Sequence, residues 1–150
     1  MNTQPPIYFH FNTTGFTLRH RTALKQFIAQ LFKDEGKELE SLNYIFCTDE
    51  YLFELNKSYL KHFTLTDIIT FELSAPDQPA ISDIFISIDR VRENAKTFKT
   101  PFNQELHRVI FHGALHLCGY KDKNKEDQKK MREKEDYYLH KYFVSRDTVS

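Results

Sequence analysis

Two histidines and an aspartate lie close together near residue 116 and could bind one metal ion. His112 and His116 are four residues apart, so on a helix they share one face and both imidazoles can reach a single ion. Gly119 is placed to end that helix with a positive φ, and the following turn can return Asp122 to the same ion. Two nitrogens and one oxygen leave a position for water, which is typical of catalytic zinc. We therefore predict one Zn²⁺ per chain, held by His112, His116 and Asp122, with the two histidines as catalytic residues.

A simpler explanation of the histidine pair is that both are core residues satisfied by hydrogen bonds. Their neighbours in the sequence are mostly apolar, and burying two imidazoles there without a partner or an ion would be costly, which favours the metal site. Cys118 lies on the opposite helix face from His116 and is expected to be a small core residue. The same nitrogen and carboxylate donors would also accept nickel or iron.

The reaction at such a site depends on which group accepts a proton. The histidine spacing resembles that of the metzincin proteases, in which a glutamate follows the first histidine and acts as the general base. Here that residue is Gly113. Without the carboxylate, peptide hydrolysis is disfavoured, whereas zinc can promote phosphodiester cleavage by lowering the pKa of water or polarising a phosphoryl oxygen.

The two histidines require a helix that holds them against a core. Thr100 and Pro101 form a good cap and first-turn pair for it, and its core stripe is predicted to be Leu106, Val109, Ile110, Gly113 and Leu117. Other helices are expected at 19–33, 49–59, 89–98 and 125–143, and strands at 7–11, 42–47, 66–73 and 83–88. These elements predict an α/β (α+β) fold. Residues 1–150 would form a single domain with a mixed four-stranded sheet covered by about five helices, including a zincin-like helix for the metal.

The composition is that of a folded domain. The 150 residues are 40% hydrophobic and contain only 4 glycines and 5 prolines, which excludes collagen-like and largely disordered chains. There are 21 basic and 21 acidic residues, so any contact with RNA must be local rather than due to a basic surface overall. The charged stretch 121–141 mixes both signs and is interpreted as a solvated helix face.

The sequence also bears on location. It contains no apolar run of the roughly 20 residues needed to cross a bilayer, and residues 1–12 lack the layout of a signal peptide. We therefore expect a cytoplasmic protein with no membrane partner, in which Cys47 and Cys118 are free thiols.

Residues 112–120 resemble the YbeY-type endoribonucleases of ribosomal RNA maturation, whose signature begins His-Gly-x-Leu-His-Leu-x-Gly-Tyr. Two further family blocks are similar to residues 55–60 and 66–71, and a third to residues 82–86. The resemblance implies a small zinc-dependent α/β fold that cleaves single-stranded RNA. It also implies maturation of the 3′ end of small-subunit (16S) rRNA, a role in ribosome quality control, and rRNA and the small ribosomal subunit as partners.

Two regions of the chain depart from the family pattern. Asp122 stands where the family has its third histidine; a carboxylate still binds zinc, but it lowers the positive charge of the site and should raise the pKa of bound water. Leu60 stands where the family has an arginine thought to contact substrate phosphate. Lys61 or His62 could bind substrate in its place, or the segment after Tyr59 could be an ordinary helix end. Leu60, and Lys121 in place of the family's acid before residue 122, leave open a ribosome-associated factor that binds rRNA without cutting it; a metalloprotease is the less favoured alternative.

Several polar residues are candidates for supporting roles. His107 and Arg108 could orient a metal ligand or contact phosphate, or could be exposed helix positions. Glu105 lies about two helical turns before His112 and could steady a ligand or be solvated. Asp67 and Asp83 begin predicted strands and could support the ligands or simply start those strands.

Overall fold

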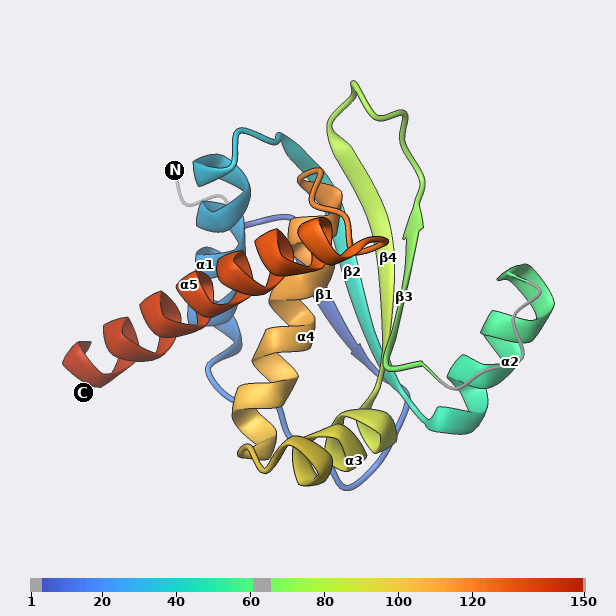
Figure 1. Cartoon of the computed structure of the whole chain (residues 1–150). Coiled ribbons are helices and arrows are strands. Elements are labelled where there is room, and N and C mark those ends of the chain that lie inside the picture. The colour runs from blue at the N-terminus through green and yellow to red at the C-terminus, as the bar shows by residue number, and fades with distance from the viewer. Residues whose placement is uncertain (1–3, 61–65, 150) are drawn as a thin grey trace.

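The computed structural model describes residues 4–60 and 66–149, the last five of these by their backbone alone. It has the predicted α+β fold, with a four-stranded mixed sheet and five helices (Figure 1). The elements follow in the order β1 (Ile7–Phe11), α1 (Arg21–Asp34), β2 (Leu39–Cys47), α2 (Asp49–Leu60), β3 (Ile68–Glu72), β4 (Ala80–Ser87), α3 (Ile88–Phe98), α4 (Phe102–Leu117) and α5 (Lys125–Val149).

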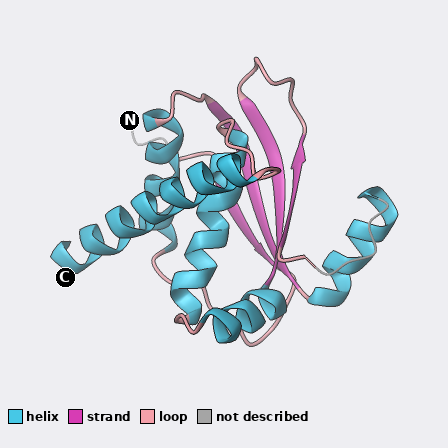
Figure 2. Cartoon of the chain, in the orientation of Figure 1, coloured by secondary structure: helices cyan, strands magenta, loops and turns pink. Residues whose placement is uncertain are grey.

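The sheet has the strand order β1-β2-β4-β3. β1 and β4 both run parallel to β2, and β3 is antiparallel to β4 at one edge. Figure 2 shows α1, α4 and α5 gathered on one side of the sheet and α2 on the other. Burial alternates along β4 because its two faces are covered unequally. Ile84 and Ile86 are fully buried in the main core, whereas Phe85, on the other face, is partly buried and packs with Leu52 of α2.

α4 lies very close to the sheet because Gly113 has no side chain. A Cβ atom at this position would lie 2.9 Å from Cδ1 of Ile84 and 3.0 Å from Cδ1 of Ile68, which is too close for two carbons. The hydroxyl of Tyr44 in β2 also donates a hydrogen bond to the carbonyl of Ile110 at 2.9 Å. These contacts fix the helix that carries both histidines over β2, β3 and β4.

Two predicted helix ends are wrong. α4 begins at Phe102 with Pro101 in the capping position, where the proline has an extended backbone and offers no side-chain hydrogen bond. Thr100 therefore does not cap the helix, and its buried hydroxyl has no hydrogen-bond partner among the described residues. α5 continues to Val149 instead of ending near residue 143. The local pattern placed both helices but not their ends, because packing decides where a helix stops.

None of the helices in residues 4–60 and 66–149 is long and apolar enough to span a membrane.

Candidate metal-binding site

A pocket of about 350 Å³ lies between α4, α2 and β3. All three predicted ligands line it: His112, His116 and Asp122. The rest of the lining comes from α2, from β3 and from the segment that leads into β3, and consists of Asn56, Leu60, Thr66, Ile68, Ile69 and Thr70.

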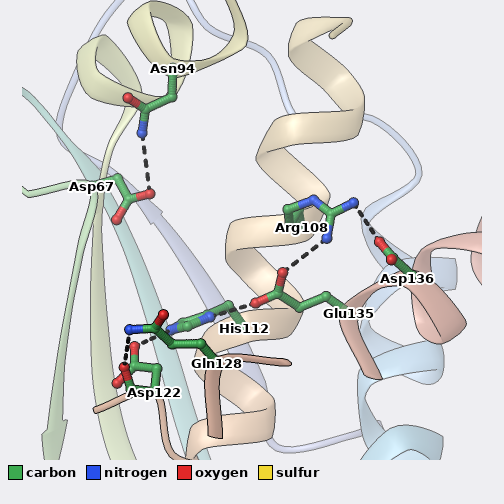
Figure 3. Close-up of polar contacts among 8 residues, drawn as sticks. All are labelled: Asp67, Asn94, Arg108, His112, Asp122, Gln128, Glu135 and Asp136. Carbon is green, nitrogen blue, oxygen red and sulfur yellow. Dashed lines mark hydrogen bonds and ion pairs between the residues drawn. The ribbon is translucent and has the colours of Figure 1, made fainter. Parts of the chain in front are cut away.

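His112 lies between two carboxylates (Figure 3). Its Nδ1 is 2.6 Å from Oε2 of Glu135, and its Nε2 is 3.3 Å from Oδ2 of Asp122. Burial opposes protonation of the ring, but the hydrogen bond and charge of Glu135, together with other nearby acids, outweigh it and raise the pKa of His112. Each ring nitrogen therefore has an anionic neighbour, and the environment favours a cation at this position.

The turn after α4 brings Asp122 to this place. Gly119 has a φ of 105°, a conformation that side chains rarely adopt. Its N–H donates to the carbonyl of His116 and the N–H of Tyr120 donates to that of Leu115, each at 3.1 Å, which closes the helix end as predicted. The carbonyl of Asp122 then accepts a hydrogen bond from Gln128 at 3.0 Å, which ties the loop to the start of α5.

The donor set suits zinc, although the three side chains do not meet at one point. A nitrogen and an oxygen bound to a tetrahedral zinc ion at 2.0–2.2 Å are about 3.3 Å apart, and the distance between His112 and Asp122 matches this separation. Nε2 of His116 instead lies 3.9 Å from Oε2 of Glu72 in β3. Throughout residues 4–60 and 66–149, no three His, Cys, Asp or Glu side chains are grouped closely enough to hold a metal ion.

Glu135 is the site residue that the sequence analysis missed. It is only 5% exposed, so interpreting the whole stretch 121–141 as a solvated face is wrong at this residue. The sequence does contain a sign of its role. Glu135 falls four residues after Met131 and three before Tyr138, on the apolar stripe of α5, where an unpaired charge would be costly.

His107 and Arg108 are not exposed helix positions. His107 is buried; its Nδ1 donates a hydrogen bond to the carbonyl of Asn103 at 2.7 Å, and its ring stacks on Tyr142. Nη1 of Arg108 donates to Oε1 of Glu135 at 2.9 Å. Arg108 thus belongs to the surroundings of His112, one helical turn before it.

Two acids lie near the site without contacting the predicted ligands directly. Oδ2 of Asp67 accepts a hydrogen bond from Asn94 at 3.4 Å, and burial raises the pKa of its carboxyl. Glu105 is buried in α4, and burial raises its pKa as well. Asp83 instead accepts a hydrogen bond from Asn43 across the sheet and is not part of the pocket lining.

The remaining predicted residues fall in different places. Leu60 lines the pocket and is 43% exposed, whereas Lys61 and His62 lie outside the described residues. Cys118 packs against the main core as expected, and burial raises the pKa of its thiol to about 12. Cys47 and Cys118 are both free thiols.

Comparison with known proteins identifies the family. The family model described as Endoribonuclease YbeY matches residues 10–143. The chain belongs to the YbeY family. Proteins named Endoribonuclease YbeY from Flavobacterium psychrophilum and Flavobacterium johnsoniae are 48% and 44% identical to it, covering 88% and 92% of this chain and 94% and 98% of their own. The solution structure of TM1509 from Thermotoga maritima is 26% identical, has a TM-score of 0.65, and covers 95% of this chain and 92% of its own.

Membership in the YbeY family agrees with the resemblance seen in residues 55–60, 66–71, 82–86 and 112–120, and the match extends well beyond them on both sides. It weighs against a metalloprotease. Gly113 does so too, because the close contact of α4 with Ile84 leaves no room there for the glutamate of a metzincin.

Proposed function

We propose that this YbeY family member is a zinc-dependent endoribonuclease that matures the 3′ end of small-subunit rRNA, with one Zn²⁺ held by His112, His116 and Asp122. The observation that supports it is the shared pocket: Nε2 of His112 and Oδ2 of Asp122 are separated by the 3.3 Å expected of two ligands of one zinc ion, and His116 lines the same pocket. Endoribonuclease is the activity named in the relatives from both Flavobacterium species.

The residues have separate roles in this proposal. His112 and Asp122 would supply a nitrogen and an oxygen to the ion, and His116, whose Nε2 lies 3.9 Å from Oε2 of Glu72, would turn toward them to supply the second nitrogen. When bound, zinc supplies Lewis-acid chemistry that stabilises negative charge on a phosphodiester oxygen and makes water a better nucleophile. Thr66 also lines the pocket; its hydroxyl donates to the carbonyl of Ile68 at 3.3 Å and could still accept a hydrogen bond from a ribose hydroxyl.

Lys61 and His62 are the proposed substrate-binding residues. Leu60 cannot bind phosphate, so Lys61 and His62 are the nearest residues in sequence that could. RNA contact must be local, because the net charge of the chain is zero. The small ribosomal subunit as a partner, a part in ribosome quality control and a cytoplasmic location stay predictions.

A cleavage assay on precursor rRNA tests the proposal. The purified protein is incubated with a transcript that extends past the 3′ end of small-subunit rRNA, with zinc or after chelation. We expect cleavage with zinc, no cleavage after chelation, and loss of both zinc and activity in His112→Ala. His140→Ala, which removes an exposed histidine of α5, is the matched control and should behave like the wild type.

Leu60 favours a second candidate, a factor that binds rRNA without cutting it. Such a factor would co-sediment with small subunits and leave the transcript intact even when loaded with zinc. That result would contradict the nuclease, and chelator-sensitive digestion of casein would instead indicate a protease.

A further inference from the structure

Glu135 is an acidic side chain inside the contact between α4 and α5, and both of its carboxylate oxygens are used. Oε1 accepts a hydrogen bond from Nη1 of Arg108 at 2.9 Å, and Oε2 lies 2.6 Å from Nδ1 of His112 (Figure 3). Nη2 of Arg108 also donates to Asp136 at 2.7 Å. A buried carboxylate is costly unless donors surround it, so these two partners account for the presence of Glu135 on the apolar stripe of α5.

The two ring nitrogens of His112 therefore have different roles: Nδ1 contacts Glu135, and Nε2 faces the pocket. A ring that donates from Nδ1 to a carboxylate has its Nε2 lone pair available when the ring is neutral. In His112 this nitrogen faces the pocket, 3.3 Å from the carboxylate of Asp122. Two acceptors at that distance repel each other unless a proton or a metal ion lies between them. At a pH where the ring is neutral, the contact with Glu135 keeps the proton on Nδ1 and leaves Nε2 available to a metal ion.

The hydrogen bond from Arg108 fixes the position of the Glu135 carboxylate. Arg108 and His112 are four residues apart on α4 and therefore share one helix face. Glu135 reaches this face from α5 and bridges the two side chains, one with each oxygen. The Arg108 side chain is 11% exposed, so solvent competes little for its hydrogen bonds.

We propose that Glu135, held by Arg108, is a positioning residue that fixes His112 with Nδ1–H directed at its carboxylate and Nε2 directed into the pocket. The inference rests on the zinc site of the proposed function and deepens it. Carboxylates that accept the second N–H of a metal-bound histidine orient the ring and increase its basicity. In this chain that carboxylate comes from α5, so the last helix takes part in the site without lining the pocket.

Glu135→Gln tests the role with almost no change in shape. A glutamine has one acceptor oxygen and one NH₂ group, so it cannot accept from both Arg108 and His112. We expect zinc binding to weaken 10- to 100-fold, measured by competition with a chromophoric chelator, while circular dichroism shows the same helix content as in the wild type. Glu133→Gln makes the same chemical change at an exposed position of α5 and should bind zinc as the wild type does.

The ring nitrogens of His112 give a second measurement that does not depend on zinc or on activity. ¹⁵N NMR of the metal-free protein, at a pH where the ring is neutral, distinguishes Nδ1–H from Nε2–H. We expect His112 to carry its proton on Nδ1 in the wild type and to lose this preference in Glu135→Gln. A wild-type ring protonated on Nε2 would overturn the proposal, and this reading needs no variant to fold.

The outcomes separate this inference from the proposed function. If the wild type binds no zinc and cuts no RNA, the proposed function fails, and the NMR measurement still decides what Glu135 does. If the wild type binds zinc and cuts RNA, and Glu135→Gln does both equally well with an unchanged His112 proton, the positioning role is wrong. Arg108→Lys, which keeps the charge but loses the planar pair of donors, should weaken zinc binding less than Glu135→Gln.

Discussion

Two glutamates connect α5 to the rest of the molecule, and they differ in what they hold. Glu35, just after α1, accepts hydrogen bonds from Tyr120 at 2.8 Å and Lys134 at 3.1 Å, and also from Tyr138. Glu135 accepts from Arg108 and lies against His112. Both are largely shielded carboxylates surrounded by donors, and Lys134 and Glu135 are adjacent residues of the same helix.

The two clusters differ in whether the side chain that contacts the glutamate has a second polar atom. A tyrosine or lysine that donates to Glu35 has no further polar group to present elsewhere, so that cluster can only join α1, α5 and the turn at Tyr120. His112 has a second nitrogen, and it faces the pocket. The same carboxylate chemistry therefore stabilises the fold in one cluster and prepares a metal ligand in the other.

The largest expected effect is on catalysis and falls on the His112 side. His112→Ala removes a predicted ligand, and losing several kcal/mol of transition-state stabilisation should lower the cleavage rate about 1000-fold or more. The free energy of unfolding should fall by about 1 to 3 kcal/mol, because buried Glu135 loses the donor at Oε2 and keeps Arg108 at Oε1. Single-turnover cleavage and urea unfolding of the same preparation measure both. A stable variant with wild-type activity would contradict the assignment.

Glu35→Ala should lower stability and leave zinc binding unchanged. It leaves the buried hydroxyl of Tyr138 without its acceptor, so the free energy of unfolding should fall by about 1 to 3 kcal/mol. Zinc affinity should stay within about twofold of the wild type, because no residue of this cluster lines the pocket. Glu38→Ala, at an exposed position three residues later, is the control for stability. Loss of zinc together with stability would show that the two clusters are coupled.

Acid should weaken the Glu35 cluster. Burial alone would raise the pKa of Glu35, but the hydrogen bonds from the two tyrosines and Lys134 outweigh it and lower the pKa below the ordinary 4.5. The resulting stability is fully present above about pH 4.5 and is lost as the pH falls through the pKa of the folded state. Urea unfolding between about pH 6 and pH 3 should therefore show a shallower loss of stability in Glu35→Gln than in the wild type. Equal slopes would mean that Glu35 has the same pKa in both states.

The smallest effect is expected at the exposed end of the same cluster. Lys134 is 38% exposed, and its ammonium lies 3.1 Å from Glu35. Lys134→Met should reduce the free energy of unfolding by less than about 1 kcal/mol, because solvent screens the ion pair and the two tyrosines still donate. Thermal unfolding detects this change. A loss as large as that of Glu35→Ala would show that the charge, and not the phenol hydroxyls, holds the cluster.

The sequence predicted much of the fold because its patterns are local. The three-four spacing of Leu24, Ile28 and Leu31 and the alternation along β4 depend on residues that are near one another in the chain. The same is true of His112, His116 and the turn at Gly119. These predictions needed only one helix and one turn to be right.

What the sequence did not predict depends on contacts between distant elements. His112 and Glu135 are 23 residues apart, and only the packing of α5 across α4 makes them neighbours. Arg108 resembled a surface residue because arginines on amphipathic helices usually are. Nε2 of His116 lies 3.9 Å from Glu72 of β3, and no spacing within residues 112–122 predicts that neighbour.

The absent side chain of residue 113 links the evolution of two buried positions, Gly113 and Ile84. Since a methyl group there would collide with the end of Ile84, a shorter residue in β4 is the compensation that would let alanine enter α4. Ile84→Val should therefore rescue Gly113→Ala in part, and homologues that vary at one of these positions should vary at the other. The close packing of Gly113 against Ile84 sets the position of α4, and so of His112 and His116, relative to the sheet.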